Sequence, residues 1–372
     1  MVTVRTETVR ISVFERLIGA LPVPYTVSAA LFATLLGPPG TVGLGLVATQ
    51  TWSATVELYF GGQPPGATWQ QVVAVIAWWV TYYVLFQAVR WERLAVARER
   101  ASLQGVTPPD YHPVFLTKNL TAFWPAAFLA VILGVVSWPF IGAVISGLEG
   151  GQHQGIRLIW LAQNSVRLGL FFMALGTLLW LSLAVLVGLT ELGNQELQLR
   201  PLEEDGLLGL RAAGSMALVV ASTYFGVASL LAAQLVLAPA IPAFGATLAV
   251  SLAFGITLFF APLWEFHRKM KAAKDRRQAD VRSRLLRLAF PAQSGPGHGE
   301  DQHEIRQVEG LVGVRESLDR ATEVLTLEAA RRELDGSSTW PFDLTILRRL
   351  GAVMLPILVA LLTELVRLAL GL

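Results

Sequence analysis

Two charged residues, Glu364 and Arg367, lie inside an apolar stretch, Leu344–Leu370, that is long enough to cross a lipid bilayer. Glu364 follows Arg349 by 15 residues, about 22 Å along a helix, which is less than a hydrocarbon core of about 30 Å. A charge at that depth is costly in lipid and usually faces a helix bundle or a water-filled path. The chemistry that Glu364 offers is therefore attraction of an ion, and its structural alternative is pairing with Arg367 near the membrane surface.

The same stretch contains a proline at its centre. Pro356 leaves one backbone carbonyl unpaired and can kink a helix. A channel needs only a hydrophobic constriction with a charged mouth, whereas a carboxylate-driven transporter needs acidic residues in the middle of other spans, and such residues are nearly absent here. The candidate pore-lining residues are Leu355, Pro356, Val359, Thr363, Glu364 and Arg367.

Few residues are spaced for catalysis. The Asp205-Gly206 pair followed by Arg211 resembles the CDP-alcohol phosphotransferases, which need further spaced aspartates to hold metal ions over a lipid substrate. The next acidic residue is Glu265, so that metal site is missing. There is no cysteine, no Gly-rich phosphate loop and no paired catalytic carboxylates or Ser/His/Asp grouping at an informative spacing. We expect no catalytic residue, metal or cofactor, and a lipid-active enzyme is a third alternative for the function.

A second group of residues marks the face that we expect in the cytoplasm. Asp205 can cap a helix and Arg211 marks the lipid boundary. His267 and Lys269 follow an apolar stretch, where a histidine among basic residues is either an interfacial anchor or a phosphate or proton site. A seam of three leucines, seven residues apart, packs within the chain or joins two copies. These leucines are Leu311, Leu318 and Leu325.

The composition excludes an ordinary water-soluble globule. Of 372 residues, 53% are apolar and 15% are charged, whereas soluble domains have about 45–50% and about 25%. The net charge of only +2 argues against a nucleic-acid partner. Nearly half of the charged residues, 26 of 56, lie between His267 and Phe342. The remainder of the chain has the composition of membrane spans.

Seven apolar stretches approach the length of about 20 residues that a transmembrane helix needs. They are 21–52, 71–89, 120–148, 166–190, 212–237, 241–266 and 344–370. Gly37-Pro38-Pro39-Gly40 interrupts the first stretch, which is either one kinked span or a re-entrant segment and a helix. Residues 21–266 thus form a six-helix transmembrane region, and 343–372 carry the seventh helix.

The distribution of basic residues predicts the orientation. With the N-terminus in the cytoplasm, 26 of 29 lysines and arginines fall on the cytoplasmic side, as the positive-inside rule requires. The C-terminus then lies outside. Residues 1–20 carry apolar side chains at helical spacing with arginines between them, which predicts an amphipathic cytoplasmic segment.

Residues 267–342 form a cytoplasmic insertion before the last span. Residues 267–290 hold nine basic and two acidic side chains without Gly or Pro, so we expect the sixth span to continue as a helix. A flexible loop follows at 291–303, and residues 298–335 hold ten acidic and five basic side chains. The two halves form either an antiparallel helical hairpin or, at 268–287, a basic stretch that binds anionic lipid.

This architecture, an all-α polytopic membrane protein with seven transmembrane helices and a helical cytoplasmic insertion before the last span, resembles the insect odorant and gustatory receptor-like superfamily of tetrameric ion channels. The resemblance rests on topology and on no motif. It implies that the last helix lines a central pore and that the cytoplasmic helices hold subunits together.

We therefore expect an oligomeric ion-conducting channel, or alternatively a membrane-anchored sensor or scaffold that acts through residues 267–342. Its partners would be the bilayer and further copies of itself. The excess of arginine over lysine, 25 to 4, is typical of a prokaryotic genome. It favours a bacterial or archaeal cytoplasmic membrane.

Overall fold

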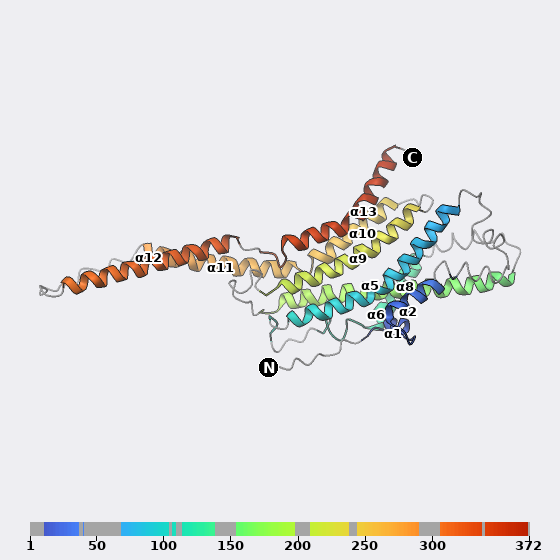
Figure 1. Ribbon diagram of the computed structural model, residues 1–372, viewed down its shortest axis with the longest axis horizontal. Helices are drawn as coiled ribbons and strands as arrows, with labels where there is room; N and C mark the ends of the chain where they lie inside the picture. Colours follow the sequence, from blue (N-terminus) through green and yellow to red (C-terminus); the bar gives the residue numbers. More distant parts are fainter. Residues whose placement is uncertain are drawn as a thin grey trace.

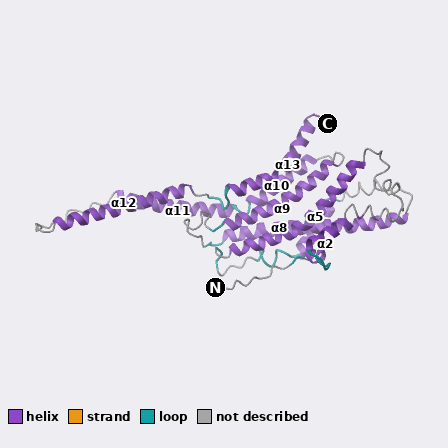
Figure 2. Cartoon of the chain, in the orientation of Figure 1, coloured by secondary structure: helices purple, strands orange, loops and turns teal. Residues whose placement is uncertain are grey.

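The computed structural model describes residues 11–36, 40, 68–103, 106–108, 114–137, 154–197, 209–237, 244–289, 306–336 and 339–370. Helices joined by turns and loops make up these residues, and no strand occurs among them (Figures 1 and 2). The expected all-α class is thereby confirmed. Figure 1 shows a bundle of long helices from which one pair of helices projects.

The helices of the bundle are α1 (Val13–Ile18), α2 (Tyr25–Leu36), α5 (Thr68–Leu103), α6 (Phe123–Val136), α8 (Gln154–Asn194), α9 (Arg211–Leu237), α10 (Phe244–Phe260) and α13 (Leu344–Leu370). The projecting pair consists of α11 (Trp264–Ala289) and α12 (Arg306–Gly336).

Helices α5, α8 and α9 pack against one another at the centre of the bundle, with α6 on α8, α2 on α5, and α10 and α13 on α9. The first half of α9 buries a series of small side chains, which let helix backbones approach closely where no hydrophobic effect drives association. These residues are Ala212, Ala213, Ala217 and Ala221. The small side chains of α9 explain why so many helices can pack against it.

Three helical segments are long and apolar enough to cross a membrane: Ser165–Asn194, Arg211–Ala233 and Leu344–Val366. A fourth is added if the bent pair Leu248–Phe260 and Trp264–Leu288 counts as one span. The described part of the chain therefore has the helices of a membrane protein, as the composition predicts.

Other expected spans are described only in part. The apolar stretch 71–89 lies inside α5, which continues for a further 14 residues as a charged helix. Stretches 21–52 and 120–148 contain two shorter apolar helices, Tyr25–Leu35 and Phe123–Val136. The choice between a kinked span and a re-entrant segment at Gly37-Pro38-Pro39-Gly40 falls largely outside the described residues. The count of seven spans stays a prediction.

The expectation of an unbroken helix from the sixth span into the cytoplasm is wrong. Residues 261–263 form a turn, and α10 and α11 meet there at a bend of 41°. Pro262 lies in this turn; it has no backbone N–H to donate and disfavours helical conformation in the residue before it. The proline lies just before the segment 267–290, so the absence of Pro within that segment did not reveal the break.

Helices α11 and α12 pack side by side as an antiparallel pair (Figure 1). Near the bundle, Gln278 Nε2 donates a hydrogen bond of 2.9 Å to Asp335 Oδ1, and Lys274 Nζ lies 3.5 Å from the Asp335 carbonyl oxygen. Because early residues of α11 meet late residues of α12, the chain turns back as the charge pattern predicts. The flexible loop expected at 291–303 lies outside the described residues.

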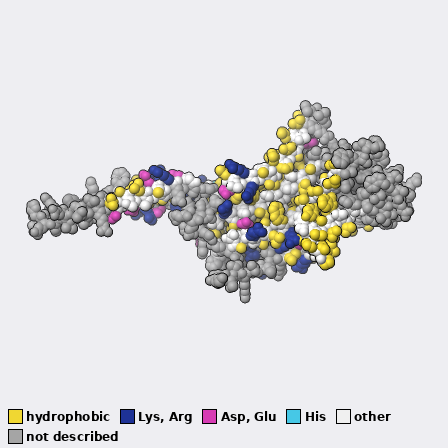
Figure 3. Space-filling view, in the orientation of Figure 1, with side chains coloured by type: hydrophobic (Ala, Val, Ile, Leu, Met, Phe, Trp, Pro, Cys, Tyr) yellow, Lys and Arg dark blue, Asp and Glu magenta, His cyan; other side chains and the backbone are white. Residues whose placement is uncertain are grey.

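Side-chain types divide along the molecule in Figure 3. Apolar side chains cover much of the visible face of the bundle, including α13, whereas basic and acidic side chains gather on the hairpin and on the end of the bundle next to it. Such a division fits a bundle that lies in lipid and a hairpin that lies in water.

Candidate functional site

The outer face of α13 carries four of the expected pore-lining residues. Leu355 is 58% exposed, Val359 is 54% exposed, and Pro356 and Thr363 are also exposed. Pro356 lies inside the helix, which continues through it to Leu370. The structure thus brings Leu355, Pro356, Val359 and Thr363 to one uncovered side of a membrane-length helix.

Glu364 lies on a different side of α13. It follows Ile357, which is fully buried, by seven residues, so the two share one face of the helix after about two turns. Ile346 and Leu350 are buried on this same face, against α9 and α10. Glu364 is therefore only half-exposed. Arg367 belongs to α13, but the placement of its side chain is not described.

Three of the residues expected at the cytoplasmic face, Arg211, His267 and Lys269, lie where the hairpin joins the bundle. His267 on α11 stacks on Trp340, with ring centroids 4.1 Å apart, and His267 Nδ1 lies 2.8 Å from the Thr339 carbonyl oxygen. Since a carbonyl oxygen can only accept a hydrogen bond, the His267 Nδ1–H group donates this bond to the Thr339 carbonyl oxygen. This environment favours the interpretation of His267 as an anchor.

Two further contacts tie the same junction together. Lys269 Nζ donates to the carbonyl oxygen of Gln195, which follows α8. Arg211, at the start of α9, lies 3.8 Å from Asp343, whose carboxylate accepts a hydrogen bond from the Ile346 backbone N–H and caps α13. Asp205, the expected cap, lies outside the described residues.

The leucine seam on α12 does not face α11. Leu318 is 66% exposed and Leu325 is 67% exposed, while the side of α12 that is turned inward carries Val324, Leu327 and the buried Leu334. Leu311 lies in α12 without a described side-chain placement. Of the two alternatives for the seam, packing within the hairpin does not occur at Leu318 and Leu325.

A buried ion pair that we did not expect joins the N-terminal helix to the bundle. Arg93 Nε lies 2.7 Å from Glu15 Oε2 and 3.0 Å from Oε1. Glu15 also completes a capping box with Ser12 at the start of α1. The side chains of Arg93 and Glu15 are only 9% and 2% exposed, so each charge depends on the other.

A second buried carboxylate lies one residue away on α5. Glu92 is fully buried and its Oε1 accepts a hydrogen bond of 3.1 Å from Ser182 Oγ on α8. Its Oε2 has no hydrogen-bond partner among the described residues. Within the described part of the bundle, two acidic residues and one arginine are thus buried.

The spacing of α5 contained a signal for these buried charges. Val89 and Val96 are fully buried, and residues three, four and seven positions apart share one helix face. Glu92 and Arg93 follow Val89 by three and four residues, which places them on the core face. Their charge suggested a cytoplasmic loop, and their periodicity indicated the core.

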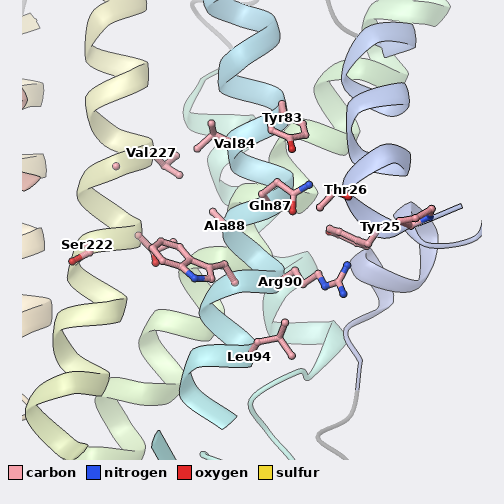
Figure 4. A pocket seen from close by; sticks show the side chains of 14 residues that line it. Tyr25, Thr26, Tyr83, Val84, Gln87, Ala88, Arg90, Leu94, Ser222 and Val227 are labelled. Carbon is pink, nitrogen blue, oxygen red and sulfur yellow. The ribbon is translucent and has the colours of Figure 1, made fainter. Parts of the chain in front are cut away.

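A cavity of about 580 Å³ opens between α2, α5 and α9 (Figure 4). In Figure 4, Gln87 and Arg90 extend from α5 toward Tyr25 and Thr26 of α2. The α9 side of the cavity is formed by Ser222, Thr223, Gly226 and Val227. No sequence motif marks this site, because its residues come from three helices that lie far apart in the chain.

The described residues contain no group of three or more His, Cys, Asp or Glu side chains that could hold a metal ion. Comparison of the whole chain with protein-family models, curated proteins and solved structures finds no match.

Proposed function

We propose that the protein is an oligomeric ion-conducting membrane protein whose last helix, α13, lines the pore. In this proposal the chain crosses the membrane seven times, with the N-terminus and the α11–α12 hairpin in the cytoplasm and the C-terminus outside. The separation of the 26 cytoplasmic from the three remaining basic residues supports this orientation.

One observation carries the proposal: α13 is the least covered of the three membrane-length helices. Only 11% of its apolar window is buried, against 50% for each of the windows in α8 and α9. Its uncovered side presents Leu355, Val359 and Thr363. Around a symmetry axis, such side chains would form a hydrophobic constriction that conducts when it is wetted.

Current measurements on the purified protein in planar bilayers test this function. Val359→Thr should raise the open probability, because a hydroxyl in a hydrophobic constriction favours wetting. Leu365→Thr is the matched control: Leu365 is 53% exposed but lies about 120° around the helix from Val359, so its variant should conduct like the wild type. The absence of current in all three proteins would rule out the channel.

The second candidate function is a membrane-anchored scaffold, and the exposed leucines of α12 favour it. Leu318 and Leu325 are exposed on a charged helix that projects from the bundle. Heptad spacing of apolar residues on an uncovered side is typical of helices that pair with another chain. A second copy of the protein would satisfy both candidate functions.

The chain has no native cysteine, which makes crosslinking direct. Leu318→Cys and Leu325→Cys should each form disulfide-linked oligomers of the full-length protein in membranes. Asp319→Cys is the control, since Asp319 is exposed on the same helix but lies about 100° around it from Leu318 and about 120° from Leu325. Equal crosslinking at all three positions would show random collision and would contradict the seam.

A further inference from the structure

The cavity between α2, α5 and α9 has the make-up of a site for an anionic amphiphile. Its α5 side combines apolar residues, Val84, Ala88 and Leu94, with the polar Gln87 and Arg90. Arg90 directly follows the apolar stretch 71–89, so along α5 the charge lies where apolar sequence ends. Lipid headgroups meet their acyl chains at such a boundary.

The cation of this site is held in place but not neutralised. The Arg90 guanidinium lies 4.7 Å from the centre of the Tyr25 ring, a cation–π contact that orients it. The Tyr25 hydroxyl donates to the Phe86 carbonyl oxygen at 2.9 Å, which fixes the ring. Among the described residues Arg90 has no ion pair, and the carboxylate of Glu15 is already paired with Arg93.

Gln87 supplies a second, independent indication of a ligand. Its side-chain Nε2 is buried and has no hydrogen-bond partner among the described residues. A buried donor without a partner costs about 1–3 kcal/mol. In Figure 4, Gln87 lies one turn from Arg90 and extends to the same side of α5. Gln87 and Arg90 thus line one cavity, and its lining contains no acidic side chain to neutralise Arg90.

Apart from the hydroxyl groups of Thr26, Tyr25, Tyr83, Ser222 and Thr223, the remaining lining of the cavity is largely apolar. Val227 of α9 faces the cavity, and Gly226 leaves open space there, since a Cβ at this position would meet no heavy atom within 4 Å. Trp91, which also lines the cavity, is 61% exposed. Val23 and Val27, which flank the lining residues Pro24, Tyr25 and Thr26 in the sequence, are 39% and 45% exposed. An acyl chain can lie along these side chains without losing contact with the bilayer.

We propose that this cavity binds an anionic phospholipid, with the phosphate bound by Arg90 and Gln87 and one acyl chain packed against Val84 and Val227. The site is separate from the basic stretch 268–287 and does not depend on whether α13 lines a pore. Charge selects anionic over zwitterionic lipid, and the apolar walls select a lipid over a free anion.

Native mass spectrometry of the full-length protein, released from detergent with phosphatidylglycerol, phosphatidylcholine or inorganic phosphate, tests the site. Wild-type protein should retain phosphatidylglycerol in preference to phosphatidylcholine and should not retain phosphate. Arg90→Gln should weaken phosphatidylglycerol binding about tenfold or more, as expected for a lost charge-assisted hydrogen bond. Arg98→Gln, an exposed arginine on the same helix outside the cavity, should bind like the wild type.

Gly226→Phe tests the same site without changing any charge, because the new ring would fill the cavity. It should also reduce phosphatidylglycerol binding, and it decides the matter if Arg90→Gln does not fold. Wild-type binding by Gly226→Phe, equal retention of phosphatidylcholine, or displacement of the lipid by inorganic phosphate would each overturn the proposal.

Discussion

Glu15 and Arg93 are 78 residues apart in the chain and form a buried ion pair, with Arg93 Nε 2.7 Å from Glu15 Oε2. The pair joins the short helix α1 to the second half of α5. Removing one partner from such a pair leaves an uncompensated buried charge, whereas replacing both by apolar residues of similar volume is often tolerated. This contact is therefore the clearest point at which the N-terminal segment and the bundle are coupled.

The ion pair predicts a strongly non-additive mutant cycle. Glu15→Ala and Arg93→Ala should each lower the free energy of unfolding by about 3–5 kcal/mol, and Glu15→Leu combined with Arg93→Met should recover much of the loss. Denaturation in detergent, followed by the fluorescence of the 11 tryptophans, measures this. If the double variant loses the sum of the two single losses, the pair is not coupled.

Gly214 on α9 lies where the segment before α13 packs on α9, and we expect that only glycine fits at this position. A Cβ at this position would overlap the Pro341 carbonyl oxygen, a backbone atom that cannot rotate away. Gly214→Ala should cost about 1–3 kcal/mol of stability, as overpacking does. Gly169→Ala is the control, because its Cβ would meet nothing within 4 Å and should stabilise α8 by about 0.5–1 kcal/mol. An unaffected Gly214→Ala variant would mean that the loop before α13 is not seated on α9.

Asp343 predicts a dependence of stability on pH. The hydrogen bond from the Ile346 backbone N–H is the main cause of a lowered pKa of its carboxyl; burial opposes it, and the nearby Arg211 adds a smaller lowering of the pKa. A lowered pKa means that the stabilisation is present above the unfolded value of about 3.9 and is lost as the pH falls through the folded value. Asp343→Asn keeps an acceptor for the cap but should reduce the loss of thermal stability from neutral pH to about pH 3. The same pH profile in wild type and variant would contradict this role.

The stack of His267 on Trp340 predicts that the hairpin holds a fixed position relative to the bundle. Trp340→Ala should widen the distribution of distances between spin labels at Leu325→Cys on α12 and Val131→Cys on α6, because the ring contact at the base of the hairpin is lost. Trp124, which is 79% exposed on α6, provides the control variant Trp124→Ala. Equal distributions in all three proteins would show that other contacts hold the hairpin.

The sequence alone determined the helical class and three of the membrane-length segments, because burial in lipid requires long apolar runs whose backbone bonds are satisfied within one helix. It also determined the charged insertion between α10 and α13, since so many charges gathered in one stretch are costly to place in lipid. These properties are local, and local spacing is sufficient to recognise them.

The tertiary structure decided which charged residues lie inside the bundle. Charge alone placed Glu92 and Arg93 beyond the end of a span, but they are buried because Ser182 and Glu15, from other parts of the chain, supply their partners. It likewise turned Leu318 away from α11 and brought Tyr25 against Arg90. Burying a charge is favourable only when a partner is present, and no pattern within one segment reveals a partner that is folded against it from elsewhere.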